Sequence, residues 1–175
     1  GLASMLPPTL ADLESAAALL ADAIEQGRRI LVVGDFDADG ATGTAVAVRG
    51  LKGLGAADVC WRMPDRIRHG YGLSTKLAEE CLALKPDVLV TVDHGISSID
   101  GVAKVREAGV RVVVTDHHLP GPTLPAADVI VNPNRPDDDF PSPHLAGCGV
   151  LFYVLIGVRA ELRQRGHAAD FRLDS

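Results

Sequence analysis

The sequence predicts an α/β protein, with a Rossmann-like parallel sheet of about five strands and helices on both faces. Three short β-branched runs, 30–33, 88–90 and 112–114, are typical of buried parallel strands. Segments with helical periodicity separate the runs, and strands that alternate with helices form right-handed βαβ units. A polar motif directly follows each run, at the sheet edge where open α/β folds carry their functional sites.

The expected elements begin with a helix over 9–27. Thr9 can cap this helix, Asp12 lies in its first turn and Gly27 ends it. Apolar runs bounded by glycine or proline predict the strands, and amphipathic stretches predict the helices. In order, the remaining elements are strand 29–34, helix 41–54, strand 58–63, helix 74–84, strand 87–92, helix 98–108, strand 110–115, strand 128–131 and helix 147–165.

Glycines, prolines and capping residues set the boundaries between these elements. Gly53 and Gly55 end the second helix, and Ser74 caps the third. Three segments rich in glycine, proline or charge are expected to be irregular. They cover residues 64–73, 119–126 and 132–144.

The length of 175 residues fits one domain. We expect an N-terminal helix over 1–28 that leads into the domain, a catalytic domain over 29–165, and the start of a linker or a truncated end over 166–175. Because neither end resembles a natural terminus, we expect the chain to be a piece of a longer protein.

Composition narrows the class of function. The net charge of −6 argues against a chain that wraps nucleic acid by bulk electrostatics. It leaves open an enzyme acting on phosphates, since a bound metal can supply the local positive charge. Cys60, Cys81 and Cys148 lack metal-ligand spacing and are expected to be reduced thiols of a cytoplasmic protein. No apolar run approaches the ~20 residues of a membrane span, so no membrane is expected as a partner.

The first polar motif, GDFDADGATGT over 34–44, carries Asp35, Asp37 and Asp39. Alternate side chains of an extended segment face the same way, so at least two of these carboxylates are expected to converge. A divalent cation would relieve their repulsion. The alternative is a solvated turn that caps the helix after Gly40.

The second motif, TVDHG, places Asp93 at the end of a strand, where its carboxylate could bridge two metals. The alternative is a cap of the next helix. His94 is expected to support the ligands or to face solvent rather than to bind metal. In the third motif, TDHH, one of His117 and His118 can bind a metal while the other contacts a phosphate. Asp116 can orient a metal-binding histidine.

Two loops are candidates for substrate contact. Arg66 and Tyr71 lie in the loop 64–73, and arginine favours bidentate contact with phosphate. Gly147 and Gly149 lie at a helix start, where their backbone could contact the substrate. The alternatives are a solvated charged loop and close packing, respectively.

Mixed oxygen and nitrogen ligands suit Mn²⁺, with Mg²⁺ as a competitor that prefers oxygen. Two metals bridged by one carboxylate can clamp the attacking and leaving oxygens of an in-line displacement at phosphorus. The residues therefore predict a metal-dependent phosphohydrolase, without naming its substrate.

The motifs GDFDADG, TVDHG and TDHH, with LAGCGV downstream, resemble the DHH phosphoesterase superfamily. The intervening DRIRHGYGLS is similar to one branch of it, the bacterial single-strand-specific exonucleases. This resemblance, from about Arg29 to Leu162, implies 5′-to-3′ release of mononucleotides from single-stranded DNA with Mn²⁺ or Mg²⁺, in recombination and repair. The implied partners are single-stranded DNA with a 5′ end, a single-strand-binding protein and a repair helicase.

The resemblance also implies the roles of the motif residues. The implied metal ligands are Asp37, Asp39, Asp93 as the bridge, and His117. Asp35 belongs to the same essential cluster, and His118 is the phosphate contact. The family continues into a segment with a further metal-binding Asp, a second domain and an oligonucleotide-binding module. This chain alone is therefore expected to have weak activity or none.

Three alternatives remain open. One is a haloacid-dehalogenase-type phosphatase, with Asp37 as nucleophile and Asp39 as acid and base. Another is a DHH enzyme acting on short oligonucleotides, cyclic dinucleotides or pyrophosphate. The third is a receiver-like switch with Asp93 as phosphoacceptor.

Overall fold

The computed structural model describes residues 5–171, and it contains one parallel sheet of five strands. The sheet has the order β2-β1-β3-β4-β5, and its parallel strands confirm the predicted Rossmann-like α/β fold. The strands are β1 (Arg29–Val33), β2 (Asp58–Arg62), β3 (Val88–Val92), β4 (Arg111–Thr115) and β5 (Val129–Val131). The helices are α1 (Leu13–Glu25), α2 (Ala38–Gly53), α3 (Arg66–His69), α4 (Thr75–Leu82), α5 (Ile99–Glu107) and α6 (Gly147–Gln164).

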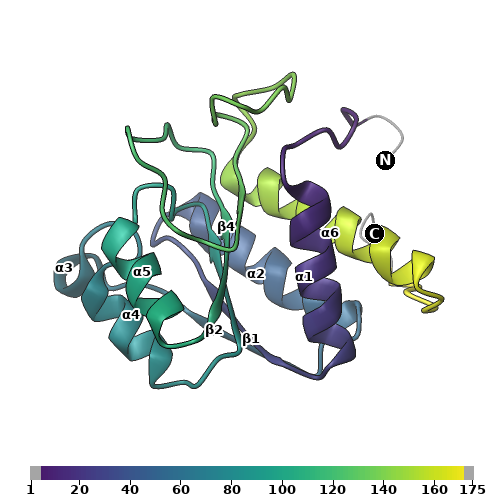
Figure 1. The fold of residues 1–175 in the computed structure, drawn as a ribbon, viewed down its shortest axis with the longest axis horizontal. Coiled ribbons are helices and arrows are strands. Elements are labelled where there is room, and N and C mark those ends of the chain that lie inside the picture. The colour runs from purple at the N-terminus through teal and green to yellow at the C-terminus, as the bar shows by residue number, and fades with distance from the viewer. Residues whose placement is uncertain (1–4, 172–175) are drawn as a thin grey trace.

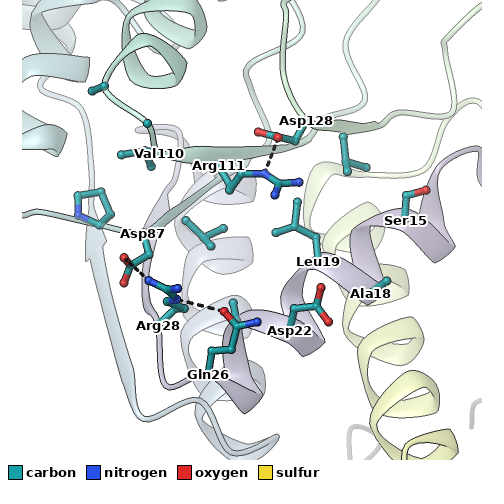
Figure 2. A pocket seen from close by; sticks show the side chains of 16 residues that line it. Ser15, Ala18, Leu19, Asp22, Gln26, Arg28, Asp87, Val110, Arg111 and Asp128 are labelled. Atoms are coloured by element: carbon teal, nitrogen blue, oxygen red, sulfur yellow. Dashed lines mark hydrogen bonds and ion pairs between the residues drawn. The ribbon is translucent and has the colours of Figure 1, made fainter.

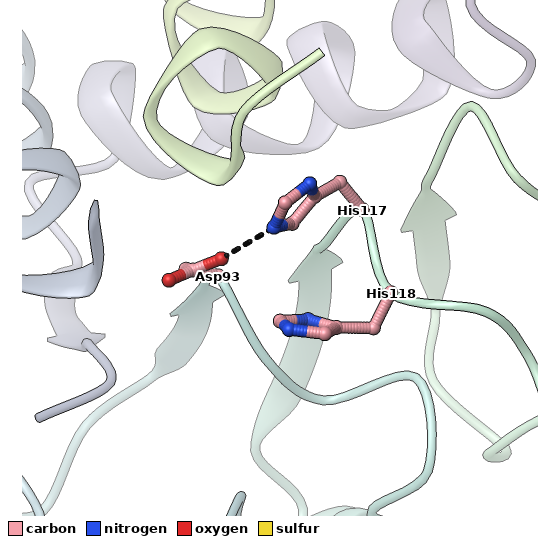
Figure 3. Close-up of side chains that lie close together, drawn as sticks. All are labelled: Asp93, His117 and His118. Carbon is pink, nitrogen blue, oxygen red and sulfur yellow. Dashed lines mark ion pairs between the residues drawn. The ribbon is translucent and has the colours of Figure 1, made fainter. Parts of the chain in front are cut away.

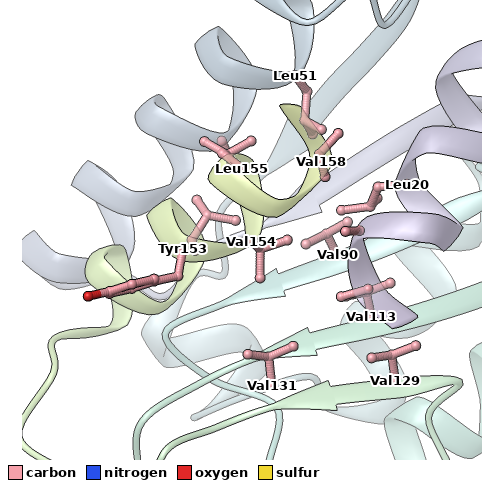
Figure 4. Close-up of a cluster of buried hydrophobic side chains, with 14 of the residues drawn as sticks. Leu20, Leu51, Val90, Val113, Val129, Val131, Tyr153, Val154, Leu155 and Val158 are labelled. Carbon is pink, nitrogen blue, oxygen red and sulfur yellow. The ribbon is translucent and has the colours of Figure 1, made fainter. Parts of the chain in front are cut away.

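Helices cover both faces of the sheet, as predicted (Figure 1). Alternate strand residues enter two cores because successive side chains of a strand point to opposite faces. Ile30 and Val32 pack with α1, α2 and α6 in the larger core. In this core, Val154 of α6 and Leu20 of α1 lie over Val90 of the sheet (Figure 4). Leu31 faces the other core, which is formed with α4 and α5. Over residues 5–171, no helix is both long and apolar enough to cross a membrane.

Two helix starts differ from the expectation, and the segment 64–73, which was expected to be irregular, contains the short helix α3. The first helix begins at Leu13 instead of Thr9, and its cap Asp12 has the left-handed φ of 59° and makes no side-chain capping hydrogen bond. The second begins at Ala38 instead of 41, because the Asp37 carboxylate accepts a hydrogen bond from the Gly40 N–H at 2.9 Å. Asp39 therefore lies in the first turn of α2 and not in an extended segment.

The segment after α6 lies against the domain. We expected residues 166–175 to begin a linker or to be a truncated end. Within the described part, His167 pairs with Glu25 at 2.6 Å, and Phe171 packs on the larger core beside Gly53. Residues 172–175 lie outside the described residues.

The register brings the carboxyl ends of three strands into line. Val33 pairs with Thr91, and Val92 pairs with Thr115. The ladder continues past the strands, since the Asp93 N–H donates to the Thr115 carbonyl at 3.0 Å and the Asp116 N–H donates to the Val131 carbonyl at 3.1 Å. The three motifs therefore meet at one edge of the sheet, as predicted.

Candidate metal centre

Asp93 is the centre of this edge. It follows β3 with a φ of 65°, a left-handed conformation that is uncommon outside glycine, and it is 1% exposed. The turn directs its carboxylate between the end of β1 and the histidines that follow β4. Such backbone strain is typical of functional sites, where the surrounding structure enforces it.

Two groups of possible ligands share Asp93. Its carboxylate forms one group with His117 and His118, whose ligand atoms all lie within 4.8 Å of one another (Figure 3). It forms the second group with Asp35 and Asp37, within the same limit. The prediction that residues of the three motifs lie close together is therefore confirmed. The structure adds Asp35 and His118 to the atoms near enough to bind a metal, although neither was predicted as a ligand.

The state of Asp93 fits a cation. Its Oδ1 is buried without a hydrogen-bond partner in the described residues, and it lies 3.0 Å from His117 Nε2 without hydrogen-bond geometry. Burial, together with the Asp39 and Asp37 carboxylates, raises the pKa of Asp93 to about 8. A buried carboxylate without a partner is unfavourable, and a divalent cation between these oxygen and nitrogen atoms would satisfy it.

His118 is oriented by Asp116, as predicted for that carboxylate. Asp116 Oδ1 lies 2.7 Å from His118 Nδ1 and accepts the N–H groups of His117 and His118. This hydrogen bond raises the pKa of His118. Burial alone would raise the pKa of Asp116, but the hydrogen bonds from His118 and from the Ile96 N–H lower it. Nε2 of His118 is thus the ring nitrogen left for the site.

Two asparagines hold the backbone of the histidine pair. Asn132 is fully buried and donates to the His118 carbonyl at 3.0 Å, while Asn134 donates to the His117 carbonyl at 2.5 Å. Sequence reasoning assigned no such role to them. Their position just after β5, the strand that neighbours β4, could have indicated that they lie beside the histidine pair.

Asp39 occupies a different environment from Asp35 and Asp37. Its carboxylate accepts the N–H groups of Gly147 at 2.7 Å and Cys148 at 2.9 Å, at the start of α6. Burial would raise the pKa of Asp39, but these hydrogen bonds outweigh it and lower the pKa. Asp39 Oδ2 lies 3.8 Å from His117 Nε2 and outside both groups, so metal binding by Asp39 stays a prediction.

His94 is fully buried and does not face solvent. Its Nε2 lies 3.0 Å from the Val33 carbonyl, which ties the end of β3 to the end of β1. Burial lowers its pKa and keeps the ring neutral. His94 therefore supports the ligand-bearing loops, which is one of the two roles expected of it.

The predicted substrate contacts surround the centre. The Arg66 guanidinium lies over the Phe36 ring, 5.1 Å from its centroid, and the Tyr71 ring meets His118 edge-on at 5.7 Å between centroids. The N–H of Gly147 is bonded to Asp39, and a side chain at this position would collide with Asp93. Gly149 packs closely on Leu145. Substrate contact by either glycine stays a prediction.

The opposite edge of the sheet has a different character. A cavity of about 710 Å³ lies at the amino ends of the strands, beside α1 (Figure 2). Two ion pairs line it: Arg28 contacts Asp87 at 3.4 Å, and Arg111 contacts Asp128 at 2.5 Å. Asp87 and Asp128 also accept the N–H groups of strand residues. We assign this edge to stability and the carboxyl edge to function.

Known proteins match the chain in sequence and in structure. The model of the DHH family, N-terminal domain, matches residues 29–172. The chain is 52% identical over 166 residues to the single-stranded-DNA-specific exonuclease RecJ of Haemophilus influenzae, covering 94% of this chain and 29% of that protein. It thus spans less than a third of the length of this relative.

Solved structures show the same fold. Exonuclease RecJ bound to manganese matches with a TM-score of 0.79 and 44% identity, over 90% of this chain and 39% of that one. RecJ from Thermus thermophilus in complex with Mg²⁺ matches with a TM-score of 0.56 and 34% identity, over 91% of this chain and 18% of that one.

The family match overturns the phosphatase and receiver alternatives. Those alternatives would use Asp37 as a nucleophile or Asp93 as a phosphoacceptor, and neither uses the histidines. The structure brings His117 within 3.0 Å of Asp93. The family match does not distinguish single-stranded DNA from the smaller substrates of the remaining alternative, which are short oligonucleotides, cyclic dinucleotides and pyrophosphate.

Proposed function

We propose that this chain, which belongs to the DHH family, is the catalytic domain of a metal-dependent phosphodiesterase that releases mononucleotides from the 5′ end of single-stranded DNA. The observation that carries the proposal is the sharing of Asp93 between two groups of ligand atoms. A two-metal site bridged by one carboxylate suits an in-line displacement at phosphorus. The similarity to RecJ exonucleases supports single-stranded DNA as the substrate.

The ligands we assign come from the two groups. Asp93, which both groups contain, would hold both ions, with His117 in one group and Asp37 beside Asp35 in the other. Asp39, whose Oδ2 lies 3.8 Å from His117 Nε2, is proposed as a further ligand. We propose Mn²⁺ as the resident metal, with Mg²⁺ as an alternative, because the site mixes carboxylate and imidazole ligands. When bound, these ions polarise the phosphate and lower the pKa of a bound water. The manganese and magnesium complexes of RecJ structures support the same choice.

The remaining residues handle the substrate. His118 is held through Nδ1 by Asp116, so its Nε2 is available to contact a phosphate oxygen near the scissile bond. Arg66 is exposed, and it has no acidic partner among residues 5–171, so its charge is free to bind a phosphate. Tyr71, 53% exposed beside His118, is placed to border the same phosphate or its base.

We extend the proposal to the setting of the whole protein. Its partners are single-stranded DNA with a 5′ end, and a single-strand-binding protein and a repair helicase that expose such strands during recombination and repair. We propose action in the cytoplasm. The three cysteines are free, which fits a reducing compartment.

The test is Mn²⁺-dependent release of mononucleotides from 5′-phosphorylated single-stranded DNA, with a 3′-phosphorylated strand and a duplex as comparisons. We would assay this chain alone and within a protein of the relatives' full length. We expect activity in the longer protein, weak activity or none in this chain, and no activity when Asp93→Ala is introduced into the longer protein.

Each other result has a definite meaning. Full activity in this chain alone would show that its ligands suffice without downstream residues. Retained activity of the Asp93→Ala protein would refute the bridging role. If the longer protein cuts no DNA but hydrolyses dinucleotides or pyrophosphate, the substrate assignment fails and the smaller-substrate alternative replaces it.

A further inference from the structure

A buried histidine outside the metal centre lies in the segment between β2 and α4. His69, the last residue of α3, has a side chain that is 2% exposed. Its Nδ1 accepts the backbone N–H of Asp65 at 2.8 Å, so the ring proton is on Nε2. Nε2 therefore donates to Glu80 Oε1 at 3.0 Å. The ring joins the start of α3 to α4.

The Glu80 carboxylate contacts three side chains in this segment or next to it. Besides His69, it contacts Arg62 at the end of β2 and Arg68 on α3, the latter at 3.5 Å. The hydrogen bonds from His69 and then Arg62 lower the pKa of Glu80 to about 2, so the carboxylate is ionised at neutral pH. One side chain of α4 thus ties down both the entry to the segment and the end of α3, which lie beside α4 (Figure 1).

The residues on either side of His69 reach the metal centre. Three residues before it, Arg66 lies over Phe36, the residue between Asp35 and Asp37. Two residues after it, Tyr71 contacts His118.

The backbone beside His69 has little rigidity of its own. Gly70 and Gly72 have φ angles of 73° and 74°, which glycine adopts freely. α3 is only four residues long, too short to be stable without outside contacts. The Asp65 carboxylate caps α3 locally, and the contact between His69 and Glu80 ties this short segment to α4.

We propose that Glu80, acting through His69 and Arg62, is a positioning residue that holds Arg66 and Tyr71 at the metal centre for substrate binding. This inference rests on the proposed function for the roles of Arg66 and Tyr71. Glu80, His69 and Arg62 belong to neither group of ligand atoms. Loss of this anchor, the contact of Glu80 with His69 and Arg62, is therefore expected to weaken substrate binding while leaving the metal ligands in place.

The test compares Glu80→Ala with Glu79→Ala. Glu79 is the neighbour on α4, more exposed and paired with Lys104 instead. Alanine favours a helix, so both variants should retain α4. Glu80→Gln keeps an oxygen that can accept from His69 and serves as the conservative rescue. The first readout is trypsin cleavage after Arg66 and Arg68 in this chain, which reports release of the segment directly.

We expect Glu80→Ala to be cleaved about tenfold faster at these two sites, with Glu79→Ala unchanged and Glu80→Gln close to the parent. The second readout is the hydrolysis of 5′-phosphorylated single-stranded DNA by the full-length protein. There we expect KM to rise about tenfold with kcat within about twofold, and Mn²⁺ affinity unchanged.

The outcomes separate the anchor from the proposed function. Equal trypsin cleavage in Glu80→Ala and Glu79→Ala would overturn the anchor, whatever the protein hydrolyses. Faster cleavage with an unchanged KM would overturn the positioning role. If the parent protein cuts no DNA, the proposed function fails, and the proteolysis result still decides whether Glu80 holds the segment. If Glu80→Ala does not fold, His69→Ala, which removes the donor to Glu80 from the other side, is subjected to the same two assays.

Discussion

At the scale of single residues, Asp93 combines three unfavourable features. It has a left-handed φ of 65°, it is 1% exposed, and its Oδ1 has no hydrogen-bond partner in the described residues. Backbone strain of this kind costs about 1–3 kcal/mol, although aspartate tolerates it better than most residues. A purely structural role would favour asparagine or glycine here. A cation bound between Asp93 and its neighbours would explain this arrangement.

The glycine that faces Asp93 gives the first residue-scale prediction. A Cβ at Gly147 would lie 2.4 Å from Asp93 Oδ1 and 2.6 Å from Asp93 Cβ. The Asp93 Cβ is fixed by the backbone and cannot swing away. We expect Gly147→Ala to displace the carboxylate and to lower Mn²⁺ affinity by about 10–100-fold, the range seen when groups that orient metal ligands are lost. Isothermal titration with Mn²⁺ measures the effect.

Gly121→Ala is the matched control for this substitution. Nothing lies within 4 Å of a Cβ built at Gly121, so this variant should bind Mn²⁺ like the parent. Equal affinity in the Gly147 and Gly121 variants would mean that Asp93 is not a ligand, or that the centre tolerates its displacement.

At the scale of elements, the two edges of the sheet divide function from stability. Asp128 precedes β5 at the amino edge, and its side chain is 8% exposed. It accepts the Val112 N–H at 2.7 Å and pairs with Arg106 and Arg111. Removal of this acceptor leaves a strand N–H and two guanidinium groups without their partner.

We expect Asp128→Ala to lower the free energy of unfolding by about 1–3 kcal/mol, while Mn²⁺ affinity stays at the parent value. Tm should fall by about 2–4 °C for each kcal/mol of unfolding free energy that is lost. Asp139→Ala removes an exposed carboxylate that makes no hydrogen bond or ion pair within residues 5–171, and it should leave Tm unchanged. A loss of Mn²⁺ affinity in Asp128→Ala would contradict the division between the edges.

The strands and helices could be predicted because the sequence shows clear apolar runs and amphipathic stretches. β1, β3, β4 and the meeting of the three motifs at one edge followed from β-branched runs such as 30–33, each followed by a polar motif. β2 and β5 followed from shorter apolar runs bounded by glycine or proline. Capping geometry did not follow, since the side chain of Asp37 caps α2 and moves its start to Ala38. This change turns Asp39 toward α6. The anchor of His69 to Glu80 was also hidden, because it depends on how the segment 64–73 folds over α4.

At the scale of the whole molecule, the net charge of −6 gives no overall attraction to an anionic strand, so local positive charge has to come from groups at the site, a bound metal among them. The acidic groups that gather at the centre repel one another without a cation. Stability and metal binding should therefore be linked. Asp93 is the residue at which this linkage is strongest, because both groups of ligand atoms contain it.

In EDTA, the parent chain should lose stability as pH rises. The pKa of Asp93 is raised to about 8 in the folded chain from 3.8, so between these values the folded state binds more protons than the unfolded state. The free energy of unfolding then falls as pH rises through this window, and the loss is complete above the folded pKa. Asp93→Asn cannot ionise, so it should lack this slope and be more stable than the parent at pH 8 in EDTA.

Added Mn²⁺ should reverse the order of the two proteins. At a metal concentration of 100 times Kd, the parent gains about 2.7 kcal/mol, whereas Asp93→Asn gains little because it lacks the shared ligand. Thermal unfolding at pH 8, with EDTA and then with Mn²⁺, measures both halves of the prediction. If Asp93→Asn is less stable than the parent in EDTA, the carboxylate contributes to folding without a metal. If Mn²⁺ raises the free energy of unfolding of both proteins equally, the ion binds at a site that does not include Asp93. The prediction requires that Asp93→Asn be the more stable protein in EDTA and the parent the more stable one in Mn²⁺. Only that reversal supports a carboxylate that is unfavourable in the free chain and is stabilised by a bound metal.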